Sequence, residues 1–188
     1  MHFLVDLSPV LNALVATYDD ERARGTLNAW GNSFPAEELP FGGQMTVDSI
    51  PFRLPKRRTG GCDSVEPLGQ EIIVPLVEAT GIALLCCGEM GDQYVTVQLH
   101  GPSVAPFEVV ARAKGAMVAA GSLIGDDGFA FSHLHYPGDY DLAMMGAAIW
   151  CAKCRWLKAL PVTLLTFGSN PLFHVLALTL LRESGHDD

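Results

Sequence analysis

Short runs of apolar residues, separated by breaks rich in glycine and proline, recur along the whole chain. Nineteen glycines and twelve prolines interrupt the sequence, and the apolar runs between them are about four to eight residues long, a length typical of β-strands. We expect strands at 3–7, 45–47, 50–54, 71–77, 82–87, 94–99, 107–112, 116–120, 129–136, 162–167 and 174–181. This pattern of about ten short strands predicts an all-β fold with little helix, an antiparallel β-sandwich of the jelly-roll kind.

Three segments carry more specific local signals. The polar pair Asp48 and Ser49 between two apolar runs predicts a hairpin at 45–54. Ser8 and Pro9 precede the segment 10–24 and Gly25 follows it, which is helix punctuation, so we expect a short helix there. The segment 141–157 is rich in Ala, Met, Leu and Trp. A helix competes with a strand in that segment, and we favour a strand from about residue 148.

Length and charge narrow the classes of partner. The 188 residues fit a single domain spanning 1–188. The net charge of −9 repels phosphate backbones, so we expect no nucleic-acid partner. No apolar stretch reaches the ~20 residues that a membrane span needs, and the amino terminus lacks the basic region of a signal peptide. We therefore expect a cytoplasmic protein without a membrane partner.

We interpret the cysteines as structural residues. An odd count of five argues against a disulfide framework. Cys151 and Cys154 have the spacing of a redox pair, but no strand-then-helix unit surrounds them. On a strand their sulfur atoms would face opposite sides of the sheet and could not pair.

Four stretches resemble a known domain. The segments 5–9, 28–40, 50–55 and 170–180 are similar to a jelly-roll domain of actinobacterial proteins. That domain occurs as stand-alone chains, and similar segments are appended to glycoside hydrolases. The resemblance implies a β-sandwich and a sugar-like or polar ligand, and it supplies no catalytic residues.

The segment 131–136 is the best candidate for chemistry. On a strand, His133 and His135 would point to the same side, with Tyr136 and Asp139 close by. Such a set could carry out general acid–base catalysis in a cleft. Two imidazoles at this spacing could also chelate a divalent metal, which is the alternative. We expect no organic cofactor, because the glycine-rich and nucleophile motifs of nucleotide enzymes and serine hydrolases are missing.

Further candidates would contact a ligand. Trp30 could stack on a sugar or another planar ring, with Asn28 and Asn32 beside it and Glu37 nearby. His174 lies in an apolar run, where a histidine is usually a core residue, but it is also a distant partner for the histidine pair. The competing interpretation of 28–40 is a structured loop that packs Trp30 onto the sandwich.

Two functional classes follow from these residues. The first is a small cofactor-independent enzyme that performs cyclisation, isomerisation or elimination on a small metabolite, in a biosynthetic pathway. The second is a non-catalytic carbohydrate-binding module. A homodimer formed through a sheet face is a further alternative, because many β-sandwiches associate in that way.

Overall fold

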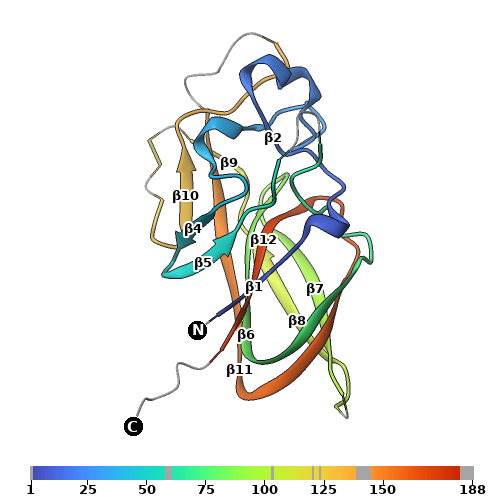
Figure 1. Cartoon of the computed structure of the whole chain (residues 1–188). Coiled ribbons are helices and arrows are strands. Elements are labelled where there is room, and N and C mark those ends of the chain that lie inside the picture. Colours follow the sequence, from blue (N-terminus) through green and yellow to red (C-terminus); the bar gives the residue numbers. More distant parts are fainter. Residues whose placement is uncertain are drawn as a thin grey trace.

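The computed structural model describes residues 2–57, 61–102, 104–119, 121–122, 124–138 and 145–182. Its elements, in chain order, are β1 (Phe3–Val5), η1 (Ser8–Val10), β2 (Ala16–Thr17), η2 (Asp19–Arg24), β3 (Phe34–Pro35), η3 (Ala36–Glu38), β4 (Gln44–Val47), β5 (Ile50–Arg53), β6 (Glu71–Gly88), β7 (Gln93–His100), β8 (Phe107–Ala113), β9 (Met117–Ala119), β10 (Gly128–Phe131), β11 (Met145–Phe167) and β12 (Phe173–Leu181). The three η elements are short 3₁₀-helices, and Figure 1 shows that strands make up most of the molecule. The helices described here are too short and too polar to cross a membrane.

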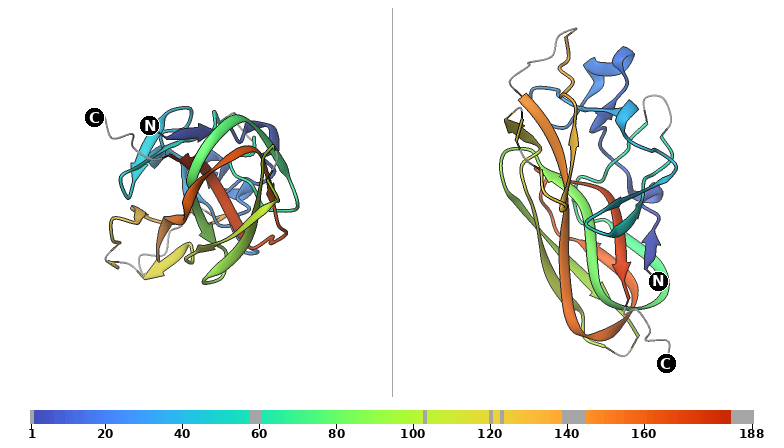
Figure 2. Two further views of the ribbon diagram at one scale, coloured as in Figure 1. Left: turned by 90° about the horizontal axis from the view of Figure 1, so that it is seen from below. Right: turned by 90° about the vertical axis from the view of Figure 1, so that its left-hand side faces the viewer.

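The main sheet is antiparallel throughout and has the order β1-β12-β6-β11-β7-β8. Strands β9 and β10 also pair with β11. Because the long strands bend, this one sheet folds over on itself (Figure 2). The predicted antiparallel β-sandwich is thus confirmed.

Strands β6 and β11 run through both parts of the sheet. The expected strands 71–77 and 82–87 are one strand of 18 residues, and 162–167 is the end of a strand of 23 residues. Gly81 permits this continuity, because a Cβ atom there would lie 2.8 Å from the carbonyl oxygen of Cys154. Register shifts between Arg155 and Leu160 interrupt the β6–β11 pairing close by, as β-bulges do where a strand bends.

Two apolar clusters lie on opposite sides of the central strands. Alternate residues of β6 divide between them: Ile82 and Leu84 face the first cluster, whereas Ala83 and Leu85 face the second. The first cluster fills the sandwich between β12 and the β7–β8 side. The second lies under the β4–β5 hairpin and β10. All nine residues of β12 are buried, because this strand separates the two clusters.

The hairpin prediction is confirmed and the helix prediction is wrong. Asp48 and Ser49 both have positive φ, as a tight two-residue hairpin turn requires. The segment 10–24 is not one helix but holds η1's last residue, β2 and η2. Residues 13–17 are all buried, and their backbone pairs with distant segments, including Ser64 and Phe34. A helix would have exposed part of this apolar run.

Two further strand boundaries differ from the prediction. Strand β10 ends at Phe131, so only the first part of the expected strand 129–136 pairs with a neighbouring strand. His135 then forms an isolated bridge with Ser33. The strand expected from about residue 148 is confirmed and begins earlier, at Met145, whereas 139–144 lies outside the described residues.

Candidate functional site

The two histidines of the candidate segment lie side by side just beyond β10. Their ring centroids are 5.0 Å apart, with the rings tilted by 51°. The backbone of His135 exchanges two hydrogen bonds with the backbone of Ser33, at 2.9 and 3.1 Å. These bonds bring the segment 132–135 alongside 33–38, about a hundred residues earlier in the chain.

Stacked aromatic rings support this junction from below. Phe34 and Phe131 stack with centroids 4.5 Å apart, and Phe129 meets the ring of Phe131 edge-on at 5.1 Å. Phe34 is fully buried and belongs to the second apolar cluster. Rings fixed on both segments restrict how far the polar groups above them can shift.

His135 is enclosed, and each of its ring nitrogens lies close to a polar side chain. Its side chain is 1% exposed. Nδ1 lies 3.2 Å from the Thr17 hydroxyl, which itself lies 2.5 Å from the Ser33 hydroxyl. Nε2 lies 3.3 Å from Oδ1 of Asp19. A carboxylate only accepts, so Nε2 carries the proton and Nδ1 accepts from Thr17.

Burial keeps His135 neutral. It is the largest cause that lowers the pKa of this imidazole, and the charges of Arg22 and His133 lower the pKa further against the opposing effect of Glu37 and Asp19. A neutral ring with a fixed tautomer suits an orienting role, since the 1% exposure leaves no surface for a ligand.

His133 differs from its neighbour because a third of its side chain is exposed. Its Nδ1 lies 2.6 Å from the Ser132 hydroxyl and 3.7 Å from Oε1 of Glu38. The same Ser132 hydroxyl hydrogen-bonds Glu38, and the Ser132 amide donates to both Glu38 oxygens, at 3.0 and 3.2 Å. The neutral imidazole can therefore donate from Nδ1 to Ser132, which donates onward to the carboxylate. This places the basic lone pair on Nε2, at the far side of the ring.

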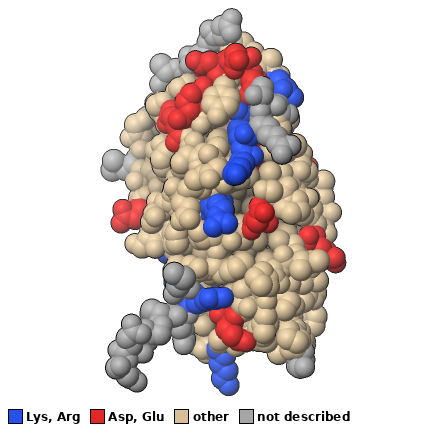
Figure 3. Space-filling model, viewed as in Figure 1, with Lys and Arg blue, Asp and Glu red and all other residues tan. Residues whose placement is uncertain are grey.

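Acidic side chains surround the histidine pair. Element η2 supplies Asp19 and Asp20, and η3 supplies Glu37 and Glu38. Hydrogen bonds from Arg22 are the main cause that lowers the pKa of Asp19. Figure 3 shows acidic side chains gathered at the end of the molecule where η2 lies.

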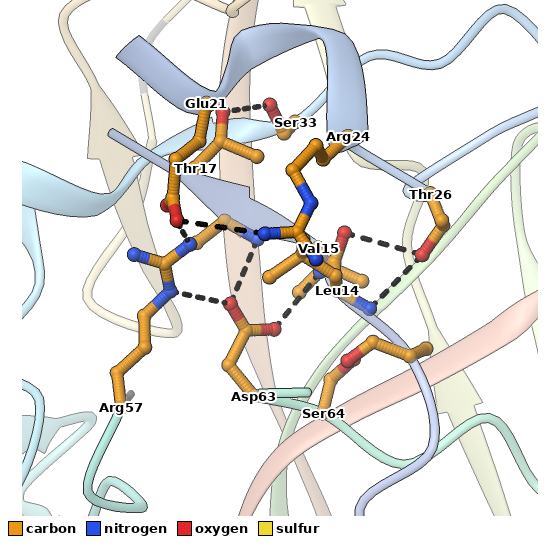
Figure 4. Close-up of polar contacts among 12 residues, drawn as sticks. Leu14, Val15, Thr17, Glu21, Arg24, Thr26, Ser33, Arg57, Asp63 and Ser64 are labelled. Atoms are coloured by element: carbon orange, nitrogen blue, oxygen red, sulfur yellow. Dashed lines mark hydrogen bonds and ion pairs between the residues drawn. The ribbon is translucent and has the colours of Figure 1, made fainter. Parts of the chain in front are cut away.

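A buried ionic cluster holds the segment that carries Thr17 and Asp19 (Figure 4). Asp63 is fully buried and accepts the amide protons of Val15 and Ala16 at 2.9 and 3.1 Å. Arg57 lies 3.4 Å from Asp63 and donates to Glu21 of η2 at 2.8 Å. Nothing in the local sequence signals this cluster, because its members are distant along the chain.

Opposing effects act on the Asp63 carboxyl group. Burial raises the pKa of Asp63 to about 7, while the two backbone hydrogen bonds and the Arg57 guanidinium lower it. The guanidinium also lies over the Tyr18 ring at 4.5 Å. The cluster thus ties the start of β2 to η2.

The loop 27–32 is closed on itself and presents one aromatic ring. Oδ1 of Asn28 accepts from the amides of Trp30 and Asn32, and the amide of Leu27 donates to the carbonyl of Asn32. Both asparagines are buried, whereas Trp30 is 56% exposed. The asparagines therefore shape the loop, and Trp30 is the group that can reach a ligand.

Similarity to a known protein family supports the β-sandwich fold. A family model described as the AziU2-like beta-sandwich domain matches residues 4–184. The chain belongs to this family. No curated protein matches it.

In this AziU2-like domain, the remaining candidate residues lie in different environments. Tyr136 is half-buried against the second apolar cluster. Glu37 is exposed and accepts a hydrogen bond from the Asp19 amide at 3.2 Å. Asp139 lies outside the described residues. His174 is buried and its Nε2 lies 3.1 Å from the Leu27 carbonyl, below the loop 27–32. Burial lowers the pKa of His174 to about 4, which marks it as a neutral core residue.

The cysteines of this AziU2-like domain follow the strand geometry. Cys151 belongs to the second apolar cluster and Cys154 packs against the first, so their sulfur atoms face opposite sides of β11. Burial raises the pKa of Cys151 to about 12 and also raises that of Cys154. Among the described residues, no group of three or more His, Cys, Asp and Glu side chains could hold a metal ion.

Proposed function

We propose that this protein is a small cytoplasmic enzyme that uses His133 for acid–base chemistry on a small metabolite in a biosynthetic pathway, without an organic cofactor. The observation that carries the proposal is the chain His133–Ser132–Glu38, in which a half-exposed imidazole is hydrogen-bonded through a hydroxyl to a carboxylate. Such a chain orients the ring and stabilises the imidazolium that forms when the ring takes a proton. Cyclisation, isomerisation and elimination all need this transfer.

The proposed proton transfer follows from the tautomer. For a cyclisation, Nε2 of His133 takes the proton from an attacking O–H or N–H group of the substrate, and the new ring bond forms as the leaving group departs. The imidazolium then returns that proton to the leaving group, so the protein ends the cycle unchanged. His135, which burial keeps neutral and whose ring nitrogens face Thr17 and Asp19, keeps the segment in register and serves as a positioning residue.

The test is a comparison of turnover between variants. The purified protein is incubated with a small-molecule extract of its source cells, and consumed and formed metabolites are identified by mass spectrometry. We expect His133→Gln to reduce turnover by about a hundredfold or more and Ser132→Ala by a smaller factor, since positioned acid–base groups contribute about 10²–10⁴-fold. Unchanged turnover in His133→Gln would contradict the proposal.

A second candidate function has an observation of its own. Trp30, 56% exposed on a rigid loop, is the kind of platform that stacks on a sugar ring, and the sequence resembles segments appended to glycoside hydrolases. Titration against a panel of sugars separates the two functions. Binding that is lost in Trp30→Ala, with no metabolite consumed by the unaltered protein, would identify a carbohydrate-binding module instead.

A further inference from the structure

A groove far from the histidines runs along the amino-terminal strand. It lies between the stretch 5–11, which runs from the last residue of β1 through η1, and the stretch 53–56 at the end of β5, and Gly61 and Cys62 also line it. Its volume is about 760 Å³, within the range of roughly 300–1,000 Å³ that small-molecule sites occupy. The half-buried Leu11 contributes apolar surface to it, whereas Leu7 and Leu54 are almost fully buried beneath it.

Two basic side chains line this groove, Arg53 and Lys56. Both are exposed, and among the described residues neither makes a hydrogen bond or an ion pair. Most other described basic side chains have a carboxylate partner: Arg22, Arg24, Arg57, Arg112, Lys114 and Lys153. In a chain with a net charge of −9, this groove is lined by two cations that have no carboxylate in contact among the described residues. Basic side chains occupy the middle of the face in Figure 3, where β1 and β5 run in Figure 1.

The carboxylate in the groove does not neutralise these cations by direct contact. Asp6 accepts the amide proton of Ser8 at 2.9 Å. Hydrogen bonding from Ser8 is the main cause that lowers the pKa of Asp6, and the charge of Arg53 lowers it further. Asp6 therefore caps the turn into η1 and stays ionised, while one cation remains in excess in the groove.

The stem of Lys56 passes close to the backbone at Gly42. Gly42 has a φ of +77°, and a Cβ atom there would lie 3.3 Å from Cγ of Lys56. The amide of Gly42 also donates to the carbonyl of Pro55 at 2.9 Å. A glycine at this position lets the lysine stem pass close to the chain, so the stretch around Lys56 is fixed beside the groove rather than free in solvent.

We propose that this groove binds a small molecule that carries one anionic group, with Arg53 and Lys56 holding the anion and the half-buried Leu11 contacting its apolar part. A guanidinium matches the two oxygens of a carboxylate or a phosphate, and an ammonium adds a point charge. This site is separate from the histidine site and does not depend on the proposed enzyme activity.

Hexanoate and hexyl phosphate are suitable probes, with hexanol as the uncharged control. Amide shifts in ¹H–¹⁵N NMR spectra report where each probe binds and how tightly. We expect at least one of the two anions to shift the amides of 6–8, 54, 56 and 61–62, and hexanol to bind at least about tenfold more weakly, since the loss of a charge-assisted contact costs about 1.5–3 kcal/mol. The anion that binds more tightly identifies the carboxylate or the phosphate class.

Variants complete the test. The double variant Arg53→Gln/Lys56→Gln should weaken binding of the anion at least about tenfold, and Arg53→Lys/Lys56→Arg should retain most of it. The matched control Arg155→Gln/Lys158→Gln removes the same charge from exposed positions on β11 and should leave binding unchanged. Absence of shifts at the groove for both anions would overturn the proposal, as would equal weakening by the two glutamine variants.

Discussion

At the scale of single residues, two neighbouring histidines lie in different environments. His135 is enclosed, with a hydroxyl at one ring nitrogen and a carboxylate at the other, whereas His133 is a third exposed and hydrogen-bonded on one side through Ser132 to Glu38. The first arrangement fixes a tautomer, and the second leaves part of the His133 side chain exposed. In the proposed function, His133 is the reacting ring and His135 the orienting ring, whereas the sequence suggested catalysis by the pair as a whole.

A third histidine makes stability depend on pH. In the unfolded chain His174 takes up a proton below about pH 6.5, but in the folded protein burial lowers its pKa to about 4. The folded state therefore binds fewer protons than the unfolded state between these values, and its stability falls as the pH falls through this window. From about pH 7.5 to about pH 5, this residue alone should cost about 2 kcal/mol.

Urea unfolding of the protein and of His174→Gln at both pH values measures this contribution. Glutamine retains a donor for the Leu27 carbonyl and cannot titrate, so the variant should lose about 2 kcal/mol less on acidification than the unaltered protein. Equal losses in the two proteins would show that His174 is protonated without difficulty inside the fold.

At the scale of elements, the two-residue strand β2 is held in place by a buried ionic cluster rather than by extensive strand pairing. Strand β2 has only Ala16 and Thr17, yet Asp63 binds the amides of Val15 and Ala16 and Arg57 ties Asp63 to η2. Isolated pairing over two residues could not hold Thr17 against His135. The ionic cluster supplies the missing constraint, so the geometry at the histidines depends on residues that never contact them.

Removal of the buried carboxylate should be costly. At about pH 8, where Asp63 is ionised, Asp63→Asn would leave Arg57 without one of its partners and place an amide group against two backbone donors. We expect a loss of about 3 kcal/mol or more in the free energy of unfolding. The exposed pair of Asp92 and Arg112 provides the control, since Asp92→Asn should cost less than about 1 kcal/mol. Similar losses in both variants, measured by urea unfolding, would mean that the buried cluster has no special role.

At the scale of the whole molecule, the alternation of apolar and polar residues predicted the fold class and most strands. It succeeded for β7 and β12, which have a buried face or faces along most of their length, and for β8, which is buried on one face in its second half. It failed where tertiary pairing decides the conformation: the segment 78–81 was left outside the predicted strands, and residues 13–17 were interpreted as part of a helix. Within the site, His133 and His135 were found by their spacing. Glu38 and Ser132, 94 residues apart, and the cluster of Arg57 and Asp63 leave no trace in local sequence. The roles of the site residues stay predictions.

Strand β12 lies between both apolar clusters and pairs with β6 on one side and with β1 on the other. Phe3 of β1 lies opposite Leu180 of β12, so residues near the two ends of the described chain meet in adjacent strands. During translation, a ribosome would release β1 and β6 long before β12 leaves the exit tunnel. Until then the inner faces of both clusters lack their shared wall, and β1 has no partner strand. A nascent chain of this protein therefore cannot complete its core in stages from the amino terminus, and its apolar faces should stay exposed to chaperones until β12 has left the exit tunnel.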